Sequence, residues 1–390
     1  MNIYRVICLV CLSAFFGLSI PDPSIAQNRL NPLEVEIDQS DPVIPLGYKK
    51  RELSTFEINR IKREIEKLDR SAKEKLQQEG DKAFKLWYRQ LKLARVIGIE
   101  TEIEALGEVG EIAWQANRGE DLRNIANRLI AIESEIKDED LSPKLLEQFA
   151  TAYQQVRYVR QAISIQKQIL AYYKQQEDLP AIKENLQILG SLYLSGFNYQ
   201  PAAEIYKQLL TQAQAQSQTD SQISSYLKTL IDIYDRTEQT KQAINARQRL
   251  IKTYEATGKD KIPPLKLEIA DNYLALNQTA KAIKAYEEAF TLASKNKQLA
   301  IADNALNSLA QLYRKEGKQE LAIATLNRLL DVQRQSYNYY GLINTYDTLG
   351  KIYLKSARKQ QAKQYFQQAL ELARELDYNL NYFNNQIEKL

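Results

Sequence analysis

The 390-residue sequence contains no histidine, only two cysteines and a single methionine. Cys8 and Cys11 lie in an apolar N-terminal segment, and the methionine is the initiator. If that segment is removed, the chain has no imidazole and no thiol, which excludes histidine-dependent triads, cysteine nucleophiles and imidazole or thiolate metal sites. A phosphate-cradling Gly-x-x-x-x-Gly-Lys loop is also absent from the sequence. We therefore expect a protein that is not an enzyme and has no cofactor, no metal and no small-molecule substrate.

The sequence also lacks a strong excess of either charge. Its 53 basic and 49 acidic residues give a formal net charge of +4. Binding to nucleic acid requires basic residues concentrated on one face, so this near-balance argues against nucleic acid as a partner. With 44% hydrophobic and 26% charged residues, the composition is typical of a soluble chain that folds.

Residues 1–26 have the pattern of a secretory signal peptide. Arg5 precedes an apolar run over residues 6–20, and residues 24–26 read Ser-Ile-Ala, with small residues at the cleavage positions. The run is shorter than the roughly 20 residues that span a bilayer, so an uncleaved anchor is the less favoured alternative and the only membrane contact we expect. Lipidation at Cys11 is disfavoured because Val10 stands where a small residue is usual. The protein is expected to be exported to a periplasm, a thylakoid lumen or the exterior.

Residues 27–53 contain three prolines and no sustained apolar period, which predicts an extended linker. Residues 54–141 are predicted to form an N-terminal helical region. It begins with a capping-box pattern at Ser54 and Glu57 and continues with apolar residues at spacings of three and four. The first helix is interpreted as one member of a helical hairpin, and a dimerising coiled-coil seam is the alternative.

The dominant feature of the sequence is a repeat of about 40 residues, from residue 142 to residue 377. Tyrosine recurs in it at a nearly constant interval, with alanine nine residues later and a large apolar residue four residues earlier. The tyrosines are Tyr153, Tyr193, Tyr234, Tyr273, Tyr313 and Tyr353. The alanines are Ala162, Ala202, Ala243, Ala282, Ala322 and Ala362. The apolar residues are Phe149, Leu189, Leu230, Ile269, Leu309 and Leu349.

The spacing within each unit predicts a pair of helices. The tyrosine and the apolar residue before it share one face of a first helix, and the alanine begins the buried face of a second. Small residues such as Gly350 and Ala362 permit close approach of the two helices. One hairpin cannot bury its apolar face alone, so the prediction is a stack of six units. Residues 378–390 continue one apolar stripe and are predicted to form a C-terminal capping helix.

Residues 348–353, Thr-Leu-Gly-Lys-Ile-Tyr, with Ala362, Phe366 and Ala369, resemble the signature of the tetratricopeptide repeat. The 40-residue length resembles the longer repeats of kinesin light chains and Leu-Gly-Asn scaffolds, and a degenerate seventh unit is predicted at Trp114. Gln166 and Arg247 depart from the signature, since an aromatic residue is usual at their positions. The resemblance implies an all-α, α-α superhelical solenoid that binds a protein or peptide on its concave face. As a whole, the chain resembles exported cyanobacterial repeat proteins of this family.

In such arrays the concave face is lined by first-helix residues that lie off the packing stripe. In the last two repeats the tyrosine register gives a set that is rich in amides and net basic, which suits an acidic segment or a free C-terminus. The function expected is a non-enzymatic scaffold for assembly or tethering outside the cytoplasm, and the alternative is a self-associating structural spacer of the cell envelope. The candidate residues are Asn304, Asn307, Gln311, Arg314, Lys315, Asn344, Asp347, Lys351 and Lys355.

Overall fold

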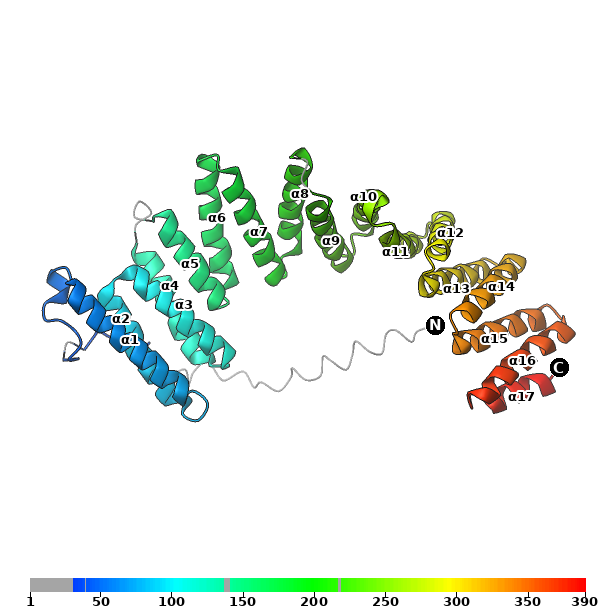
Figure 1. Ribbon diagram of the computed structural model, residues 1–390, viewed down its shortest axis with the longest axis horizontal. Coiled ribbons are helices and arrows are strands. Elements are labelled where there is room, and N and C mark those ends of the chain that lie inside the picture. Colours follow the sequence, from blue (N-terminus) through cyan, green and yellow to red (C-terminus); the bar gives the residue numbers. More distant parts are fainter. Residues whose placement is uncertain (1–30, 39, 137–140, 217–218) are drawn as a thin grey trace, which may run out of the picture. The chain divides into compact units, whose positions relative to one another are not determined.

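The computed structural model describes residues 31–38, 40–136, 141–216 and 219–390 (Figure 1). In these ranges the regular elements are helices, and none is a strand, so the predicted all-α class is confirmed. The predicted signal peptide, residues 1–26, lies outside the described residues. Within them, every helix is too short or too polar to cross a membrane.

Seventeen α-helices follow one another in the described part of the chain, and from α6 onward most of them have the same length. They are α1 (Thr55–Lys75), α2 (Gly80–Ile97), α3 (Ile99–Gln115), α4 (Gly119–Glu135), α5 (Pro143–Gln155), α6 (Val159–Gln175), α7 (Leu179–Ser195), α8 (Tyr199–Ala215), α9 (Asp220–Arg236), α10 (Thr240–Thr257), α11 (Ile262–Ala275), α12 (Thr279–Lys295), α13 (Leu299–Lys315), α14 (Gln319–Gln335), α15 (Tyr339–Lys355), α16 (Lys359–Glu375) and α17 (Leu380–Glu388). Two short 3-10 helices, η2 (Tyr48–Lys50) and η4 (Lys259–Lys261), precede α1 and α11.

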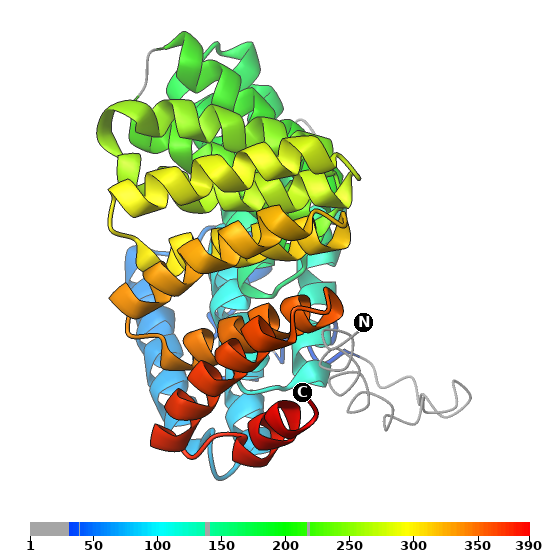
Figure 2. The ribbon, with the colours of Figure 1, turned by 90° about the vertical axis from the view of Figure 1, so that its right-hand side faces the viewer.

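The chain divides into two compact units, residues 1–185 and 186–390, with the boundary inside α7. In the first unit α1 packs on α2, α3 on α4 and α5 on α6, and the first helices α3 and α5 contact each other. In the second unit each hairpin, such as α13 with α14, packs on the next one along the chain, and α17 packs on α16. Figure 2 shows these hairpins of the second unit layered in sequence order. Each unit is therefore a stack stabilised by contacts between neighbours.

The repeated residues form the core of the hairpins as predicted. All six alanines of the series are fully buried, and the six apolar residues are buried as well. Four of the tyrosines are buried, while Tyr193 and Tyr273 are half-buried. At Gly350 a Cβ atom would come within 2.7 Å of the Phe366 ring. The small residues therefore allow the close helix approach that the sequence predicts.

The turn inside each hairpin has one residue in the left-handed region, four positions after the series tyrosine. The next residue donates its backbone N–H to the tyrosine carbonyl, as in the bond from Arg358 to Tyr353 at 2.9 Å. This bond satisfies a carbonyl at the end of the first helix. The left-handed residues are Arg157, Phe197, Glu238, Asn277, Gly317 and Ala357, with φ between 55° and 72°.

This turn leads to a pair of opposite stability predictions. Ala357→Gly is expected to raise the free energy of unfolding by about 1 kcal/mol, because glycine adopts positive φ without the clash that an L side chain meets. Gly317→Ala, at the same position one repeat earlier, is expected to lower it by about the same amount. Urea unfolding followed by circular dichroism measures both. Equal midpoints for the two variants would show that these turns carry no strain.

The N-terminal region, where a degenerate repeat is predicted at Trp114, contains a hairpin of α3 and α4 with the turn geometry of the later repeats, but its register differs by one residue from the prediction. The left-handed turn residue after α3 is Asn117, and the bonded carbonyl is that of Ala113. Ala113 is therefore the structural equivalent of the series tyrosine, and it is 0% exposed. Trp114 is 48% exposed, with the Arg157 guanidinium 4.7 Å from its ring centroid. The sequence pattern points to Trp114 because it is aromatic and close to the expected spacing. The buried residue at this position is instead the small Ala113.

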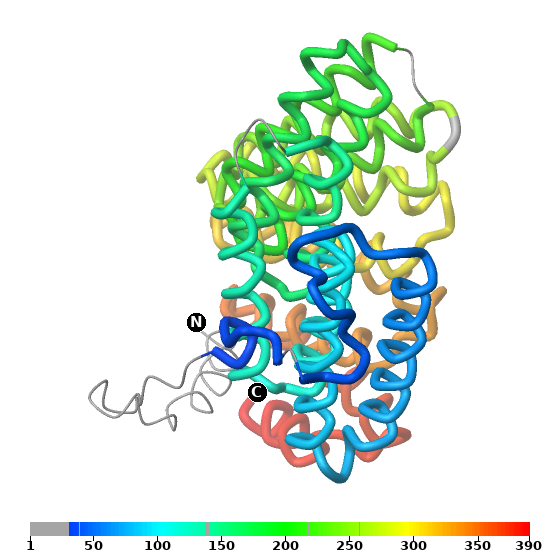
Figure 3. Tube along the Cα trace, turned by 90° about the vertical axis from the view of Figure 1, so that its left-hand side faces the viewer, coloured from blue at the N-terminus to red at the C-terminus, as the bar shows by residue number. Residues whose placement is uncertain are grey.

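The extended linker predicted for residues 27–53 is also wrong for the part that the structure describes. Leu33 and Ile44 are buried, and Ile44 belongs to an apolar cluster with residues of α1 and α2. Arg95 donates to the Leu33 carbonyl at 2.6 Å, and Arg89 binds Asp41 at 2.8 Å. Figure 3 shows this segment running across the first helices. The prolines prevent a helix, but isolated apolar residues between them still pack.

The predicted helix starts are confirmed by their caps. The Ser54 hydroxyl accepts from the Glu57 backbone N–H, and the Glu57 carboxylate accepts from the Ser54 backbone N–H. Ser142 caps α5 in the same way, accepting from the Leu145 N–H at 3.2 Å. Each cap satisfies a donor that the first turn of a helix leaves unpaired.

Candidate functional site

The structure places the nine candidate residues on two first helices, α13 and α15, of the second unit. Eight of them are exposed and Asp347 is half-buried. The Gln311 amide donates to Asn307 at 3.3 Å, so the amides on α13 form a local row. In the described part of the chain, Arg314, Lys315 and Lys355 form no ion pair, and their charges are available to a partner.

Lys351 and Asp347 are partly engaged by the C-terminal helix. The Lys351 ammonium contacts the Asp347 carboxylate at 2.5 Å and lies 5.4 Å from the ring centroid of Tyr382 on α17. Tyr382 also donates its hydroxyl to Asp347 at 2.8 Å. Burial acts to lower the pKa of Lys351, but the hydrogen bonds to Asp347 and Tyr382 outweigh it, and the pKa is raised. Lys351 and Asp347 are therefore less available to bind a partner than Arg314, Lys315 and Lys355.

The same face of the second unit contains a cavity of about 410 Å³ two repeats earlier, between α9 and α11. Lys228, Asp232 and Asp235 line it, and they occupy the register positions of Asn307, Gln311 and Arg314. Its other walls include Pro264 and Glu268 from α11. The cavity therefore lies on the first-helix face, defined here as the surface formed by the first-helix residues at the candidate register positions.

Arg247 of α10 forms the floor of this cavity, and we call the cavity the Arg247 pocket. Arg247 is 5% exposed. Its guanidinium binds both oxygens of Asp235 at 2.6 and 3.0 Å, Glu268 at 2.7 Å and the Asn272 amide oxygen at 3.0 Å. A buried guanidinium needs such partners, because an unpaired buried charge is strongly unfavourable. The desolvation of Arg247 acts to lower its pKa, but the bonds to Asp235 and Glu268 raise it.

The rim of the Arg247 pocket combines apolar and charged groups. The Tyr254 ring is buried, and the ammoniums of Lys261 and Lys228 lie 5.2 and 6.0 Å from its centroid. Leu250 and Leu265 add aliphatic surface. Asp235 and Glu268 are half-exposed and can accept further hydrogen bonds. The pocket suits an apolar side chain flanked by backbone amide and carbonyl groups.

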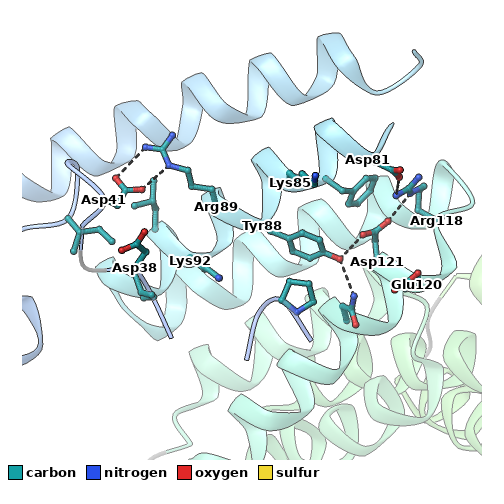
Figure 4. A pocket seen from close by; sticks show the side chains of 16 residues that line it. Asp38, Asp41, Asp81, Lys85, Tyr88, Arg89, Lys92, Arg118, Glu120 and Asp121 are labelled. Atoms are coloured by element: carbon teal, nitrogen blue, oxygen red, sulfur yellow. Dashed lines mark hydrogen bonds and ion pairs between the residues drawn. The ribbon is translucent and has the colours of Figure 1, made fainter. Parts of the chain in front are cut away.

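A larger cavity, about 750 Å³, lies in the first unit between residues 32–44, α2 and α4 (Figure 4). Most of its charges are paired with each other. Arg118 binds Asp81 and Asp121, each at 2.7 Å, and Tyr88 donates to Asp121 at 2.6 Å. Desolvation by burial and the bond to Asp121 raise the pKa of Tyr88, so the phenol stays protonated. These pairs connect α2 and α4, which indicates a mainly structural role.

The residues of the Arg247 pocket are absent from the predicted site. Their signal in the sequence is Arg247 itself, a charged residue at a buried position where the repeat usually has an aromatic residue. Its carboxylate partners come from α9 and α11, 12 and 21 residues away. Gln166, the other departure from the signature, is likewise buried and hydrogen-bonds Asn185. In the described ranges, no group of three or more His, Cys, Asp or Glu side chains is placed to hold a metal ion.

Known protein families match this chain within its repeat region. Two family models, each described as tetratricopeptide repeat, match residues 264–296 and 298–375. No curated protein matches the sequence. Among solved structures, BtubC (BKLC) of P. vanneervenii is 19% identical over 56% of this chain and 92% of its own, with a TM-score of 0.37.

Two further solved structures are similar at comparable levels. A kinesin light chain protein of Podosopora anserina with nearly identical TPR-like repeats is 18% identical over 50% of this chain and 98% of its own, with a TM-score of 0.34. Aspartyl phosphate phosphatase F of Bacillus subtilis is 16% identical over 73% of this chain and 78% of its own, with a TM-score of 0.38. Likeness at this level says nothing about a shared partner. The two family models identify residues 264–296 and 298–375 as tetratricopeptide repeats, a module that indicates a scaffold for protein–protein interaction.

Proposed function

We propose that this protein is a non-enzymatic scaffold, exported from the cytoplasm, that binds an extended segment of a partner protein along its first-helix face. The observation that carries the proposal is the Arg247 pocket, which combines apolar walls with free hydrogen-bonding capacity on the face that the repeat register marks for binding. The export part of the proposal rests on the signal-peptide pattern of residues 1–26.

The chemistry of this face suggests how a segment binds. An apolar side chain enters the Arg247 pocket against Tyr254 and Leu265, while Asp235 and Glu268 accept backbone N–H groups beside it. Further along, the exposed amides of α13 and α15 pair with the extended backbone. The free cations Arg314, Lys315 and Lys355 then attract carboxylates. The preferred partner segment therefore carries an apolar anchor and an acidic stretch or a free C-terminus.

Site-specific photo-crosslinking tests the proposal. The full chain is produced with a photoreactive phenylalanine derivative in place of Leu265, on the wall of the pocket, or in place of Lys284, an exposed residue on the second helix α12. After irradiation in the extracytoplasmic fraction, we expect a discrete protein adduct from position 265 and none from position 284.

Charge-reversal substitutions and a mass measurement complete the test. The position 265 adduct should be lost when Arg314, Lys315 and Lys355 are changed to glutamate, because the same segment must reach both regions. Equal adducts from positions 265 and 284 would rule out the first-helix face as the binding surface. If the position 265 adduct is a second copy of this chain and light scattering gives twice the mass of one exported chain, the self-associating spacer replaces the scaffold.

A further inference from the structure

A second cavity in the residue 186–390 unit, about 390 Å³, lies among α8, α9 and α10 and is lined by cations without any acidic residue. Lys207 comes from α8, Tyr234 from α9, and Lys241, Asn245 and Arg249 from α10. The last three are spaced by four residues, so they share one face of α10. This cavity, which we call the basic pocket, has none of its lining residues in common with the Arg247 pocket.

The charges of the basic pocket are poorly compensated within the protein. Arg249 donates to the neutral amide oxygen of Gln214 at 3.0 Å, and in the described ranges neither it nor Lys241 forms an ion pair. Lys207 pairs with Glu204 at 2.9 Å, a bond that raises its pKa and keeps it charged. Lys241 also lies in the first turn of α10, where the positive end of the helix dipole disfavours a cation. Helix stability therefore does not explain this arrangement.

The repeats supply an internal comparison, because each lining position recurs at a fixed offset from the series tyrosine. The position of Lys207 is counted from Tyr193, the tyrosine of its own repeat. The positions of Lys241 and Arg249 are counted from Tyr234. At the junction of α12 to α14 the same positions hold Glu287, Glu320 and Arg328. At the junction of α14 to α16 they hold Asn327, Gln360 and Gln368.

The other two junctions complete the comparison. On α6 and α8 the positions in the repeat register hold Lys167, Gln200 and Gln208, and at the junction of α10 to α12 they hold Gln248, Ala280 and Glu288. Three cations together occur only at the α8 to α10 junction of this series. The fold accepts acidic, neutral and basic residues at these positions, so the concentration of positive charge is a property of this one junction.

We propose that the basic pocket binds a multiply charged oxyanion of the phosphate class. Its donors are suited to that chemistry: a guanidinium and two ammoniums supply charge-assisted hydrogen bonds, and the Tyr234 hydroxyl and Asn245 amide add neutral donors. None of the residues that line the pocket is acidic, and the Glu204 carboxylate beside it is paired with Lys207. The volume accommodates a phosphate or diphosphate group with its first water molecules. This site is independent of the partner segment proposed for the first-helix face.

Calorimetric titration of the full chain with sodium pyrophosphate, at constant ionic strength, tests the proposal. We expect one site, weakened about tenfold or more by Lys241→Gln and by Arg249→Gln, since each removes a charge-assisted bond. Arg160→Gln, at the register position of Lys241 in an earlier repeat, is the matched control and should leave the affinity unchanged. A parallel titration with glycerol 3-phosphate shows whether a free diphosphate or a phosphate monoester binds more tightly, and either order supports recognition of the oxyanion.

Chemical acetylation read by mass spectrometry locates the site independently of the variants. Pyrophosphate should slow the modification of Lys207 and Lys241 and leave that of Lys284 on α12 unchanged. The proposal is overturned if no heat is detected at millimolar pyrophosphate, if both α10 variants bind as the parent does, or if all three lysines are protected equally.

Discussion

Replacing Glu102 by glutamine is expected to lower the free energy of unfolding of the N-terminal unit by about 3 kcal/mol. Glu102 is 2% exposed, and its carboxylate accepts from Arg95 at 2.8 Å and from Arg128 at 2.8 and 3.1 Å. Removing the anion leaves two arginines near each other, and the remaining counter-charge is the exposed Glu135 carboxylate, 3.4 Å from Arg128. This expected loss lies at the lower end of the range for disrupting a buried ion pair, because both arginines keep some contact with solvent.

The same substitution should also release the N-terminal segment, because Arg95 holds the Leu33 carbonyl as well as Glu102. Amide hydrogen exchange around residues 33–44 and urea unfolding measure the two effects. Glu104→Gln, on the exposed side of the same helix, is the control and should stay within about 0.5 kcal/mol of the parent. If Glu102→Gln behaves like this control, the buried triad does not stabilise the unit.

The second large effect is expected at Arg247. Arg247→Ala removes the shared partner of Asp235 and Glu268 and leaves a cavity beneath them. We expect a loss of roughly 2–3 kcal/mol in the free energy of unfolding, less than for a fully buried network, since both carboxylates can regain water. Urea unfolding of the full chain, followed by circular dichroism, gives the value.

Arg247→Phe separates stability from binding at the same position. Phe366 is fully buried at the equivalent place in the last repeat, where it packs on Gly350, but Ile231 occupies the glycine position here. Arg247→Phe is therefore combined with Ile231→Ala, which makes room for the ring, and this protein should unfold closer to the urea concentration of the parent than Arg247→Ala does. The bulky ring removes the charged floor of the Arg247 pocket, and the crosslink from position 265 should be lost with it. A stable double variant that still gives the adduct would show that the pocket does not contact the partner.

The sequence is sufficient to predict the helical hairpins because local spacing determines them. Tyrosine and alanine recur in register, and each pair occupies the buried faces that the period of a helix predicts. Ser54 and Ser142 likewise indicate helix starts through bonds to residues three positions away. Features that depend on neighbours within a few residues were therefore predictable.

The features that the sequence does not predict depend on residues distant along the chain. Leu33 and Ile44 become buried only because α1 and α2 present an apolar surface to them. Arg247 becomes the floor of a pocket only because Asp235 and Glu268 reach it from two other helices. The spacing of residues within one helix carries no information about which partner a side chain meets across a junction.

The hydrogen-bonded turn inside each hairpin has a consequence for how such a gene can change. Because the turn tolerates arginine, phenylalanine, asparagine and alanine at its left-handed position, no single codon is required to keep it. Within each unit a hairpin contacts its neighbours along the chain, so in-frame duplication or loss of one repeat's codons there re-creates a junction of the same geometry. The length of the array can therefore vary by recombination between copies, while point changes on the exposed faces adjust each copy separately.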